Sequence, residues 1–341
     1  MRLNIFESAP DGFLDSPPEK MCEVLPGPSL IRFRGEEDPP LFVATLLHGN
    51  ETTGIQAIRK LVKKYQAEGA RLPRSLDLFV GNIEAAKSNV RRFSSQPDYN
   101  RIWRGGHLPE HRLADQVKSF VQQSGVFASV DIHNTSGKNP HYACFNRLQG
   151  PFVNLARLFS QILVYFTRPR EVLSNAFSEF CPSITIEAGQ PGDPYGVQHV
   201  YDFLEKCLHL KQISSTVNHK ENLYVYHTLA RIHVPEKSRI GFNGNHPDRD
   251  FSFIENLDLQ NFTELPEDSL LGWRFNANLE LSVINEKDQQ VGGDYIQYVD
   301  HEIRLKRAVV PSMFTTNEQI VHQDCLGYLM ERYTLPIGTD G

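Results

Sequence analysis

The stretch Leu41-Phe-Val-Ala-Thr-Leu-Leu-His-Gly-Asn-Glu-Thr-Thr-Gly54 joins a short apolar run to an imidazole and a carboxylate that lie just beyond it. The apolar run, residues 41–47, has the length of one buried strand and is too short to span a membrane. A Gly-Asn pair interrupts the run, and two threonines then precede a helical pattern of apolar residues. His48 and Glu51 are therefore predicted on a strand-to-helix turn, where open α/β sheets place their sites.

Two later segments end in a similar way. Ala128-Ser-Val-Asp-Ile-His133 is an apolar strand pattern that ends in a histidine, and Pro182-Ser-Ile-Thr-Ile-Glu187 is another that ends in a glutamate. A single polar residue at a strand end is usually just solvated, but three strand ends with groups able to bind a metal or act as a base indicate a common site. Imidazole and carboxylate groups are typical zinc ligands, and a catalytic zinc keeps one coordination position open. We predict that His48, Glu51 and His133 bind one Zn²⁺ per chain, with Glu187 as the general base.

Four motifs follow one another between Leu41 and Leu208: HGNE, then GN with the later RF and DYNR, then DIHNT, then TIEAG. In order and spacing they resemble the succinylglutamate desuccinylase/aspartoacylase family, a branch of the zinc carboxypeptidase superfamily. The resemblance implies an α/β fold in which helices flank a mixed, zinc-carboxypeptidase-like sheet, followed by a smaller C-terminal β-domain. In that family, two histidines and the first glutamate bind one zinc, and the late glutamate activates the water. Those roles coincide with the ligands and the base predicted above.

The middle motif contains three arginines close together, Arg91, Arg92 and Arg101, which is usual for a solvated basic patch. The fork of a guanidinium group, however, also suits a substrate carboxylate or a developing oxyanion. In the family, an arginine followed by an aromatic residue polarises the scissile carbonyl, and an Asn-Arg pair binds the acidic part of the substrate. The resemblance therefore implies Arg92 for the first role and Asn100 with Arg101 for the second. Counting from the Gly-Asn pair favours Arg91 for the first role instead.

The stretch before Glu187 departs from the pattern of aspartoacylase, which carries a tyrosine and an arginine there to hold aspartate. Residues 173–180, LSNAFSEF, contain neither. We therefore do not expect a preference for aspartate derivatives.

A second zinc motif is present in the sequence but is not expected to bind metal. His107-Leu-Pro-Glu-His111 matches the inverted zinc-protease signature His-x-x-Glu-His. That signature needs both histidines on one face of a helix, whereas Pro109 is suited to the first position of a helix. The pattern therefore predicts an exposed helix start that leaves His107 outside the helix.

The composition is that of a protein without nucleic-acid or membrane partners. The net charge of −6 argues against nonspecific nucleic-acid binding, and no stretch has the length of a membrane span. The first twenty residues lack the apolar segment of a secretory signal. Five cysteines without C-x-x-C spacing are typical of free thiols in a reducing compartment, so a cytoplasmic location is expected.

The hydrophobic pattern divides the 341 residues into two domains. Residues 1–40 form a polar, Pro-rich lead-in with edge strands, and apolar strands then alternate with amphipathic helices. Beyond residue 220, short alternating strands are separated by Gly and Asn turns, which indicates a small β-domain. We expect a catalytic domain over 1–215 and a β-rich domain over 220–341. Tyr295 or Tyr298 of the β-domain could contact the substrate, although cross-strand packing is the simpler interpretation.

Together these features predict a zinc-dependent hydrolase that cleaves an amide bond, most simply the acyl amide of an N-acyl amino acid or a related small molecule. The same groups could instead serve a metallocarboxypeptidase that acts on the C-terminus of a peptide. A third alternative is a family member that binds a ligand without hydrolysing it. The presence of Glu187 argues against this alternative, because loss of the base would be its simplest signature.

Overall fold

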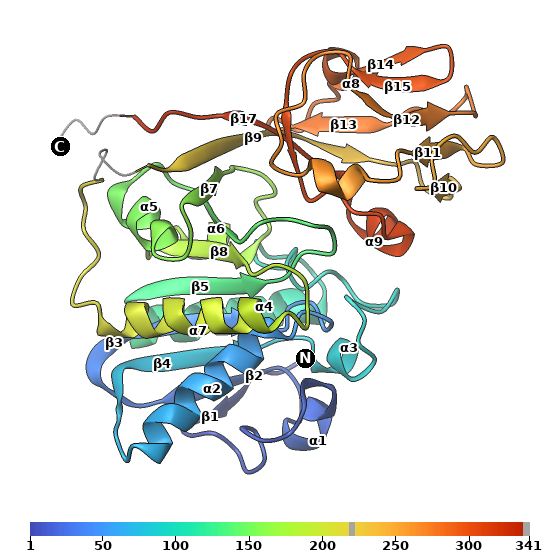
Figure 1. The fold of residues 1–341 in the computed structure, drawn as a ribbon. Coiled ribbons are helices and arrows are strands. Elements are labelled where there is room, and N and C mark those ends of the chain that lie inside the picture. The colour runs from blue at the N-terminus through green and yellow to red at the C-terminus, as the bar shows by residue number, and fades with distance from the viewer. Residues whose placement is uncertain (218–221, 337–341) are drawn as a thin grey trace. The chain divides into compact units, whose positions relative to one another are not determined.

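The computed structural model describes residues 1–217 and 222–336 (Figure 1). They fall into two compact units, of which the first contains Met1–Asn134 and His141–Tyr224. The second contains Val225–Thr334 together with the short segment Thr135–Pro140. The boundary expected between residues 215 and 220 includes positions that lie outside the described residues.

A mixed sheet with the strand order β1-β2-β4-β3-β5-β8-β6-β7 forms the centre of the first unit. Strands β3, β5 and β8 are parallel neighbours, whereas β2 is antiparallel to β4 and β6 is antiparallel to β8. The parallel strands are buried along almost their whole apolar length, as expected when helices cover both faces of a sheet. The strands are β1 (Asn4–Phe6), β2 (Ser29–Phe33), β3 (Gly35–Thr45), β4 (Leu72–Val80), β5 (Ala128–His133), β6 (Tyr142–Phe145), β7 (Ile162–Tyr165) and β8 (Ser183–Glu187).

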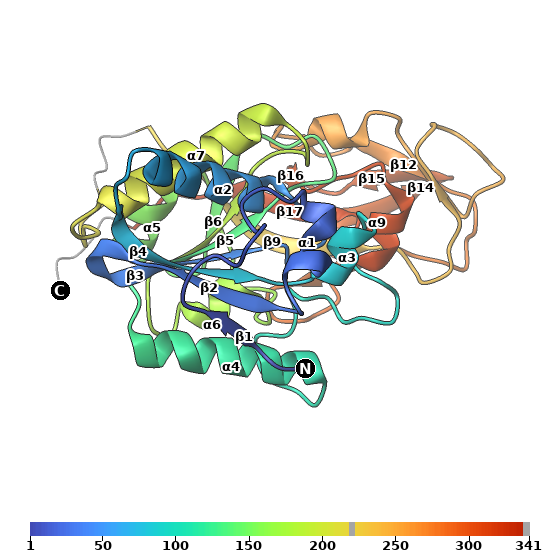
Figure 2. The ribbon, with the colours of Figure 1, turned by 90° about the horizontal axis from the view of Figure 1, so that it is seen from below.

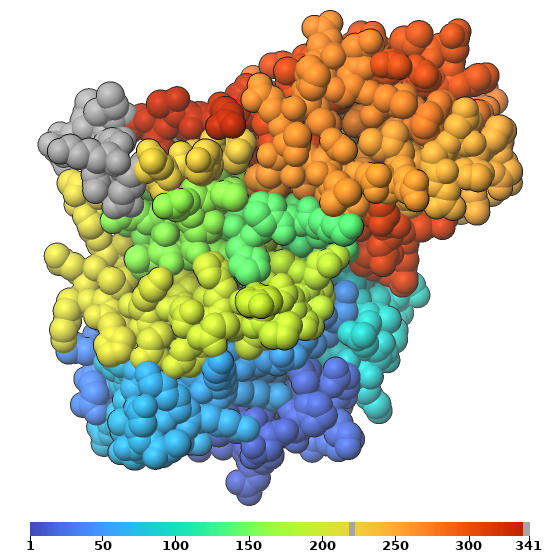
Figure 3. All heavy atoms as spheres, in the orientation of Figure 1, coloured from blue at the N-terminus to red at the C-terminus, as the bar shows by residue number. Residues whose placement is uncertain are grey.

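Helices lie on both faces of this sheet, with α2 and α7 on one face and α4 and α6 on the other (Figure 2). Figure 3 shows the atoms of α2 and α7 side by side on the surface of the unit, and the two helices are in contact. On the opposite face, Phe42 stacks on Phe177 and Trp103 meets the same ring edge-on. The helices are η1 (Pro18–Lys20), α1 (Met21–Val24), α2 (Thr53–Ala67), α3 (Ile83–Lys87), α4 (Pro109–Ser124), α5 (Gly150–Arg157), α6 (Leu173–Phe177) and α7 (Pro194–His209).

The second unit is rich in β-structure and has its own apolar core, with Phe251, Phe253 and Ile303 among its fully buried side chains. One set of strands pairs β9 with β13 and β17, and β17 with β16. A separate small sheet has the order β10-β11-β12-β15-β14. The elements are β9 (Tyr224–His233), β10 (Ile240–Gly241), β11 (Phe251–Phe253), η2 (Leu257–Gln260), β12 (Leu270–Arg274), β13 (Ser282–Asn285), α8 (Gly292–Tyr295), β14 (Ile296–Val299), β15 (Glu302–Leu305), β16 (Val310–Ser312), α9 (Glu318–Gln323) and β17 (Gly327–Arg332).

The architecture confirms the predicted fold class, an α/β unit with a mixed sheet and a second small sheet towards the C-terminus. The Tyr298 hydroxyl accepts a hydrogen bond from the Leu281 backbone N–H, and the Arg274 guanidinium lies over its ring. This arrangement matches the packing interpretation of Tyr298. Among the described residues, no helix combines the length and the apolar character needed to cross a membrane.

The segment Thr135–Pro140 belongs to the second unit, although it follows β5 directly in the sequence. The side chain of Asn261 donates hydrogen bonds to the carbonyls of Lys138 and Phe314, at 3.2 and 2.9 Å. Asn139 Oδ1 accepts from the backbone N–H of Met313. The contacts of Lys138 and Asn139 join residues more than a hundred positions apart, and the domain boundaries expected from sequence do not include them.

Candidate metal centre and active site

The turn between β3 and α2 is shaped by the loop that follows β4. Leu46 has a positive φ of 54°, which turns the chain out of the sheet one residue after β3 ends. The backbone N–H of Gly81 donates to the carbonyl of Thr45 at 3.0 Å, and that of Asn82 donates to the carbonyl of Leu46 at 2.6 Å. A Cβ at Gly49 would lie 2.2 Å from the backbone of α3, so only glycine fits there. The turn therefore follows one defined path, and this path fixes the positions of His48 and Glu51.

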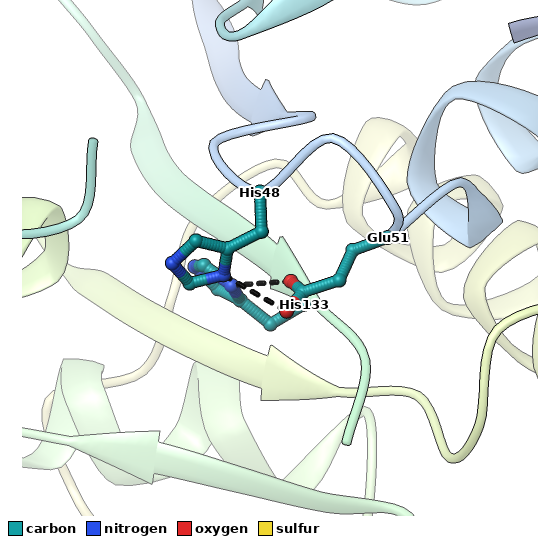
Figure 4. A group of neighbouring side chains, drawn as sticks. All are labelled: His48, Glu51 and His133. Carbon is teal, nitrogen blue, oxygen red and sulfur yellow. Dashed lines mark hydrogen bonds and ion pairs between the residues drawn. The ribbon is translucent and has the colours of Figure 1, made fainter. Parts of the chain in front are cut away.

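His48, Glu51 and His133 form one buried group at the ends of β3 and β5 (Figure 4). Nδ1 of His48 lies 2.8 Å from Glu51 Oε1, and Nδ1 of His133 lies 2.7 Å from Glu51 Oε2. One donor atom from each of the three side chains lies within 4.8 Å of the other two. Two imidazole nitrogens and a carboxylate at this spacing are a donor set that suits zinc with an open coordination position. Among the described residues, this is the one group of its kind.

The charges within the group are strongly coupled. Burial by itself would raise the pKa of Glu51, but the adjacent His48 and His133 imidazoles hold that pKa far below its usual range. Burial opposes charge on His133 as well, yet the neighbouring Asp131 and Glu51 carboxylates raise the pKa of its imidazole well above the usual value. Without a metal, the Glu51 carboxylate is thus held ionised beside positive charge, and a bound cation would take the place of the proton on His133.

The outward-facing nitrogen of each histidine lies beside a second carboxylate. His48 Nε2 is 3.0 Å from Asp98 Oδ1, and His133 Nε2 is 2.9 Å from Asp131 Oδ2. The contact of Asp131 has the distance of an ion pair, and neither of its oxygens has a hydrogen-bond partner in the described part of the chain. Carboxylates behind metal-binding histidines fix the ring orientation and leave the other nitrogen for the metal. Both histidines therefore offer Nδ1 as the ligand atom.

Glu187 lies beside the group and is not one of its three members. In the parallel pairing of β5 and β8, Glu187 is directly opposite His133, so the two side chains project from the same face of the sheet. Glu187 is buried, and its Oε2 has no hydrogen-bond partner among the described residues. Burial raises the pKa of Glu187 to about 8, against the lowering influence of His133. A carboxyl group with this pKa can both accept and release a proton near neutral pH.

The structure brings Arg91 to the ligand group and directs Arg92 elsewhere. Arg91 Nη2 lies 2.8 Å from Asp98 Oδ2, and its Nη1 lies 3.9 Å from Glu51 Oε1. Arg92 Nη1 instead donates to the carbonyl of Gln96 at 3.1 Å. Successive residues on this irregular loop project to different sides. The predicted role of Arg92 as the oxyanion arginine stays a prediction, and of the two neighbours it is Arg91 that lies beside the group.

Asn100 and Arg101 lie next to the group as well. Asn100 Nδ2 is 3.2 Å from His133 Nε2, and Asn100 Oδ1 accepts a hydrogen bond from the Leu173 backbone. Arg101 Nη1 donates to the carbonyl of Asn100 at 2.9 Å. Their predicted role in binding substrate stays a prediction, now with both residues placed close to the ligands.

The inverted motif is not part of the ligand group. Helix α4 begins at Pro109, which leaves His107 outside the helix as expected from the sequence. His111 Nδ1 accepts a hydrogen bond from the Leu108 backbone N–H at 3.2 Å, so it caps the start of its own helix.

Asn134 links three segments of the site, a role that was not predicted. Its Nδ2 donates to Thr53 Oγ1 and to the carbonyl of Gly189, both at 2.9 Å. Its own backbone N–H donates to Glu51 Oε2 at 3.3 Å. The residue thus connects the start of α2, the end of β5 and the turn after β8. One indication of this role was present in the sequence, namely that Asn134 directly follows the predicted ligand His133.

Comparison with known proteins identifies related domains. The family model of the succinylglutamate desuccinylase/aspartoacylase catalytic domain matches residues 38–200. No curated protein shows significant sequence similarity to the chain.

Solved structures with a similar fold cover most of the chain. Succinylglutamate desuccinylase from Chromobacterium violaceum is 16% identical with a TM-score of 0.56, and the match covers 89% of this chain and 87% of that one. The product-bound ectoine utilization protein EutE (DoeB) from Ruegeria pomeroyi is 14% identical with a TM-score of 0.57, covering 88% of both chains. Murine aminoacylase 3 is 14% identical with a TM-score of 0.53, covering 88% of this chain and 99% of that one. At these identities the matches establish the fold.

Proposed function

The chain belongs to the succinylglutamate desuccinylase/aspartoacylase family, and from this premise we propose that it is a zinc-dependent hydrolase that cleaves the amide bond of an N-acyl amino acid or a related small molecule. The observation that carries the proposal is the buried His48–Glu51–His133 group with Glu187 beside it. A metal-binding donor set and a carboxyl group of raised pKa are the two components that metal-assisted amide hydrolysis needs.

The metal would be held by Nδ1 of His48, Nδ1 of His133 and the Glu51 carboxylate. When bound there, Zn²⁺ supplies a Lewis acid that lowers the pKa of a water molecule and polarises a carbonyl oxygen. The Asp98 and Asp131 carboxylates behind the two imidazoles orient the rings for this purpose.

Glu187 acts as the base and then as the acid of the reaction. Its carboxylate takes a proton from the attacking water as the water oxygen bonds to the amide carbon. As the carbon–nitrogen bond breaks, the carboxyl group gives that proton to the leaving nitrogen, which departs as an amine. Oε2 of Glu187, which has no hydrogen-bond partner within residues 1–217 and 222–336, is available for both transfers. The raised pKa makes the return of the proton favourable near neutral pH.

Arg91 stabilises the negative charge that develops on the carbonyl oxygen. Its guanidinium lies against the ligand group, 3.9 Å from Glu51 Oε1, whereas Arg92 is turned towards the carbonyl of Gln96. A fixed cationic donor aimed at a developing oxyanion is among the largest contributions to catalysis. Arg101, with Asn100, binds the carboxylate of the substrate, which both family resemblance and position support.

The substrate is proposed to be an N-acyl amino acid other than N-acetylaspartate. Residues 173–180 include helix α6 and lack the tyrosine and arginine expected of an aspartate-binding site. A site without a partner for a charged side chain cannot favour the charged substrate.

Steady-state kinetics of the zinc-loaded protein tests this proposal. The panel contains N-acetylaspartate, N-succinylglutamate, a neutral N-acetyl amino acid and a pentapeptide. We expect hydrolysis of at least one N-acyl amino acid, with N-acetylaspartate no better than the neutral compound. Glu187→Gln, purified in parallel, should lose activity by ~10²-fold or more and so controls for contaminating hydrolases. Efficient trimming of the pentapeptide would favour a carboxypeptidase, and no turnover of any compound would contradict the proposal.

A further inference from the structure

Asp98 uses both of its carboxylate oxygens within the site. Its Oδ1 lies 3.0 Å from His48 Nε2 and accepts the backbone N–H of Asn100 at 2.7 Å. Its Oδ2 accepts a hydrogen bond from Arg91 Nη2 at 2.8 Å. The Asp98 and Arg91 side chains are each only 11% exposed. The carboxylate is therefore a largely buried bridge between a predicted metal ligand and the proposed oxyanion arginine.

The backbone closes this bridge into a ring. The N–H of Gly49, the residue after His48, donates to the carbonyl of Arg91 at 3.1 Å. Arg91 is thus held to the same turn twice, through its main chain at Gly49 and through its side chain by way of Asp98 and His48. One connection holds the main-chain carbonyl of Arg91 and the other holds its guanidinium, so the guanidinium has little freedom to move.

Arg91 needs such a restraint because a second carboxylate is within reach. Its Nη1 lies 3.9 Å from Glu51 Oε1, which is also 2.8 Å from His48 Nδ1 in the ligand group. Guanidinium groups form strong bidentate pairs with carboxylates. An arginine released from Asp98 would pair with Glu51 and compete with the cation for that carboxylate.

We propose that Asp98 is a positioning residue that holds Arg91 away from the metal ligand Glu51 while it orients the metal ligand His48. The proposal rests on the proposed function. It states that Asp98 allows an arginine and a metal cation to occupy the same site. Asp98 also offsets the positive charge of the guanidinium, since the two groups form a close ion pair. Its contribution is to the arrangement of the site and not to proton transfer.

A set of zinc-affinity measurements, made by competition with a chelator, tests the proposal without using activity. Asp98→Asn should weaken zinc binding by ~10- to 100-fold, as is usual when a carboxylate behind a metal-binding histidine is lost. Adding Arg91→Met to that variant should recover a large part of the loss, because the competing guanidinium is then absent. Asp131→Asn is the matched control, since Asp131 lies beside the other histidine and the structure records no pair between it and Arg91. In that background, Arg91→Met should give a smaller gain.

The proposal is overturned if Asp98→Asn binds zinc as tightly as the unchanged protein, or if Arg91→Met gives the same gain in all backgrounds. Asp98→Ser, carried through the same measurements, replaces Asp98→Asn if thermal unfolding shows that the latter is not folded. A protein that shows this pattern of zinc affinities but hydrolyses no compound of the panel would refute the proposed function and support the role of Asp98. Hydrolysis with no effect of Asp98 on zinc affinity would do the reverse.

Discussion

Asn134→Ala is expected to destabilise the first unit far more than an ordinary surface substitution. The change removes two short hydrogen bonds, to Thr53 Oγ1 and to the Gly189 carbonyl, and two longer ones of 3.4 Å, from the Thr53 N–H and to the Ala188 carbonyl. Asn134 is only 6% exposed, so water cannot easily replace these contacts.

The size of the effect follows from these contacts. Two well-formed hydrogen bonds contribute about 2 kcal/mol together, and leaving buried partners unsatisfied adds about 1 to 2 kcal/mol. We therefore expect the free energy of unfolding to fall by about 3 kcal/mol, which corresponds to a Tm lower by about 6 to 12 °C for a unit of this size.

Chemical denaturation of the metal-free protein is the appropriate assay, because a bound metal would add its own stabilisation. Asn175→Ala is a matched control in the same unit, since it removes one hydrogen bond of 3.3 Å and should cost less than about 1 kcal/mol. Asn134→Asp gives a further check, because it places a carboxylate against the Gly189 carbonyl and should also destabilise. If Asn134→Ala costs no more than Asn175→Ala, Asn134 does not connect the segments as argued.

Three further predictions concern the ligand turn, the arginines and the base. Burial raises the pKa of Glu187 from 4.5 to about 8, so the stability linked to its neutral form is fully present below pH 4.5 and is lost as the pH rises through 8. Glu187→Gln should therefore gain stability over the unchanged metal-free protein at pH 9 but not at pH 5; an equal difference at both pH values would contradict this. Arg91→Ala should lower kcat by ~10²- to 10³-fold, whereas Arg92→Ala should leave kcat within about threefold; reversed effects would return the role to Arg92. Gly49→Ala should displace the ligand turn and reduce zinc content, because its Cβ would lie 2.2 Å from the backbone of α3, while Gly293→Ala, with open space around its Cβ, should bind zinc normally.

The sequence was most informative where a regular period fixes the position of a side chain. The apolar strand that precedes His48 and the strands that end in His133 and Glu187 are parallel neighbours, so these residues meet at one edge of the sheet. The helix expected to start at Pro109 is α4. Asp131 could have been found in the same way, because residues two apart on a strand share a face and Asp131 precedes His133 by two.

The arginines could not be assigned in this way, because the loop that carries them has no repeating geometry. The side chains of Arg91 and Arg92 differ in direction through contacts with Asp98 and Gln96, which the sequence alone does not locate. The segment 135–140 was missed for a related reason. Its partners, Asn261 and Met313, are distant in the sequence, and no local pattern marks such a contact.

The central claim is that His48, Glu51 and His133 hold one zinc ion while Glu187 remains free to act as the base. Elemental analysis of the purified protein and two variants after zinc loading and desalting tests it most directly. The account predicts about one zinc per chain for the unchanged protein and for Glu187→Gln, and almost none for His48→Ala, because two remaining ligands rarely hold zinc tightly. Full zinc occupancy in His48→Ala would contradict the ligand assignment, and loss of zinc from Glu187→Gln would show that Glu187 is a ligand and not the base.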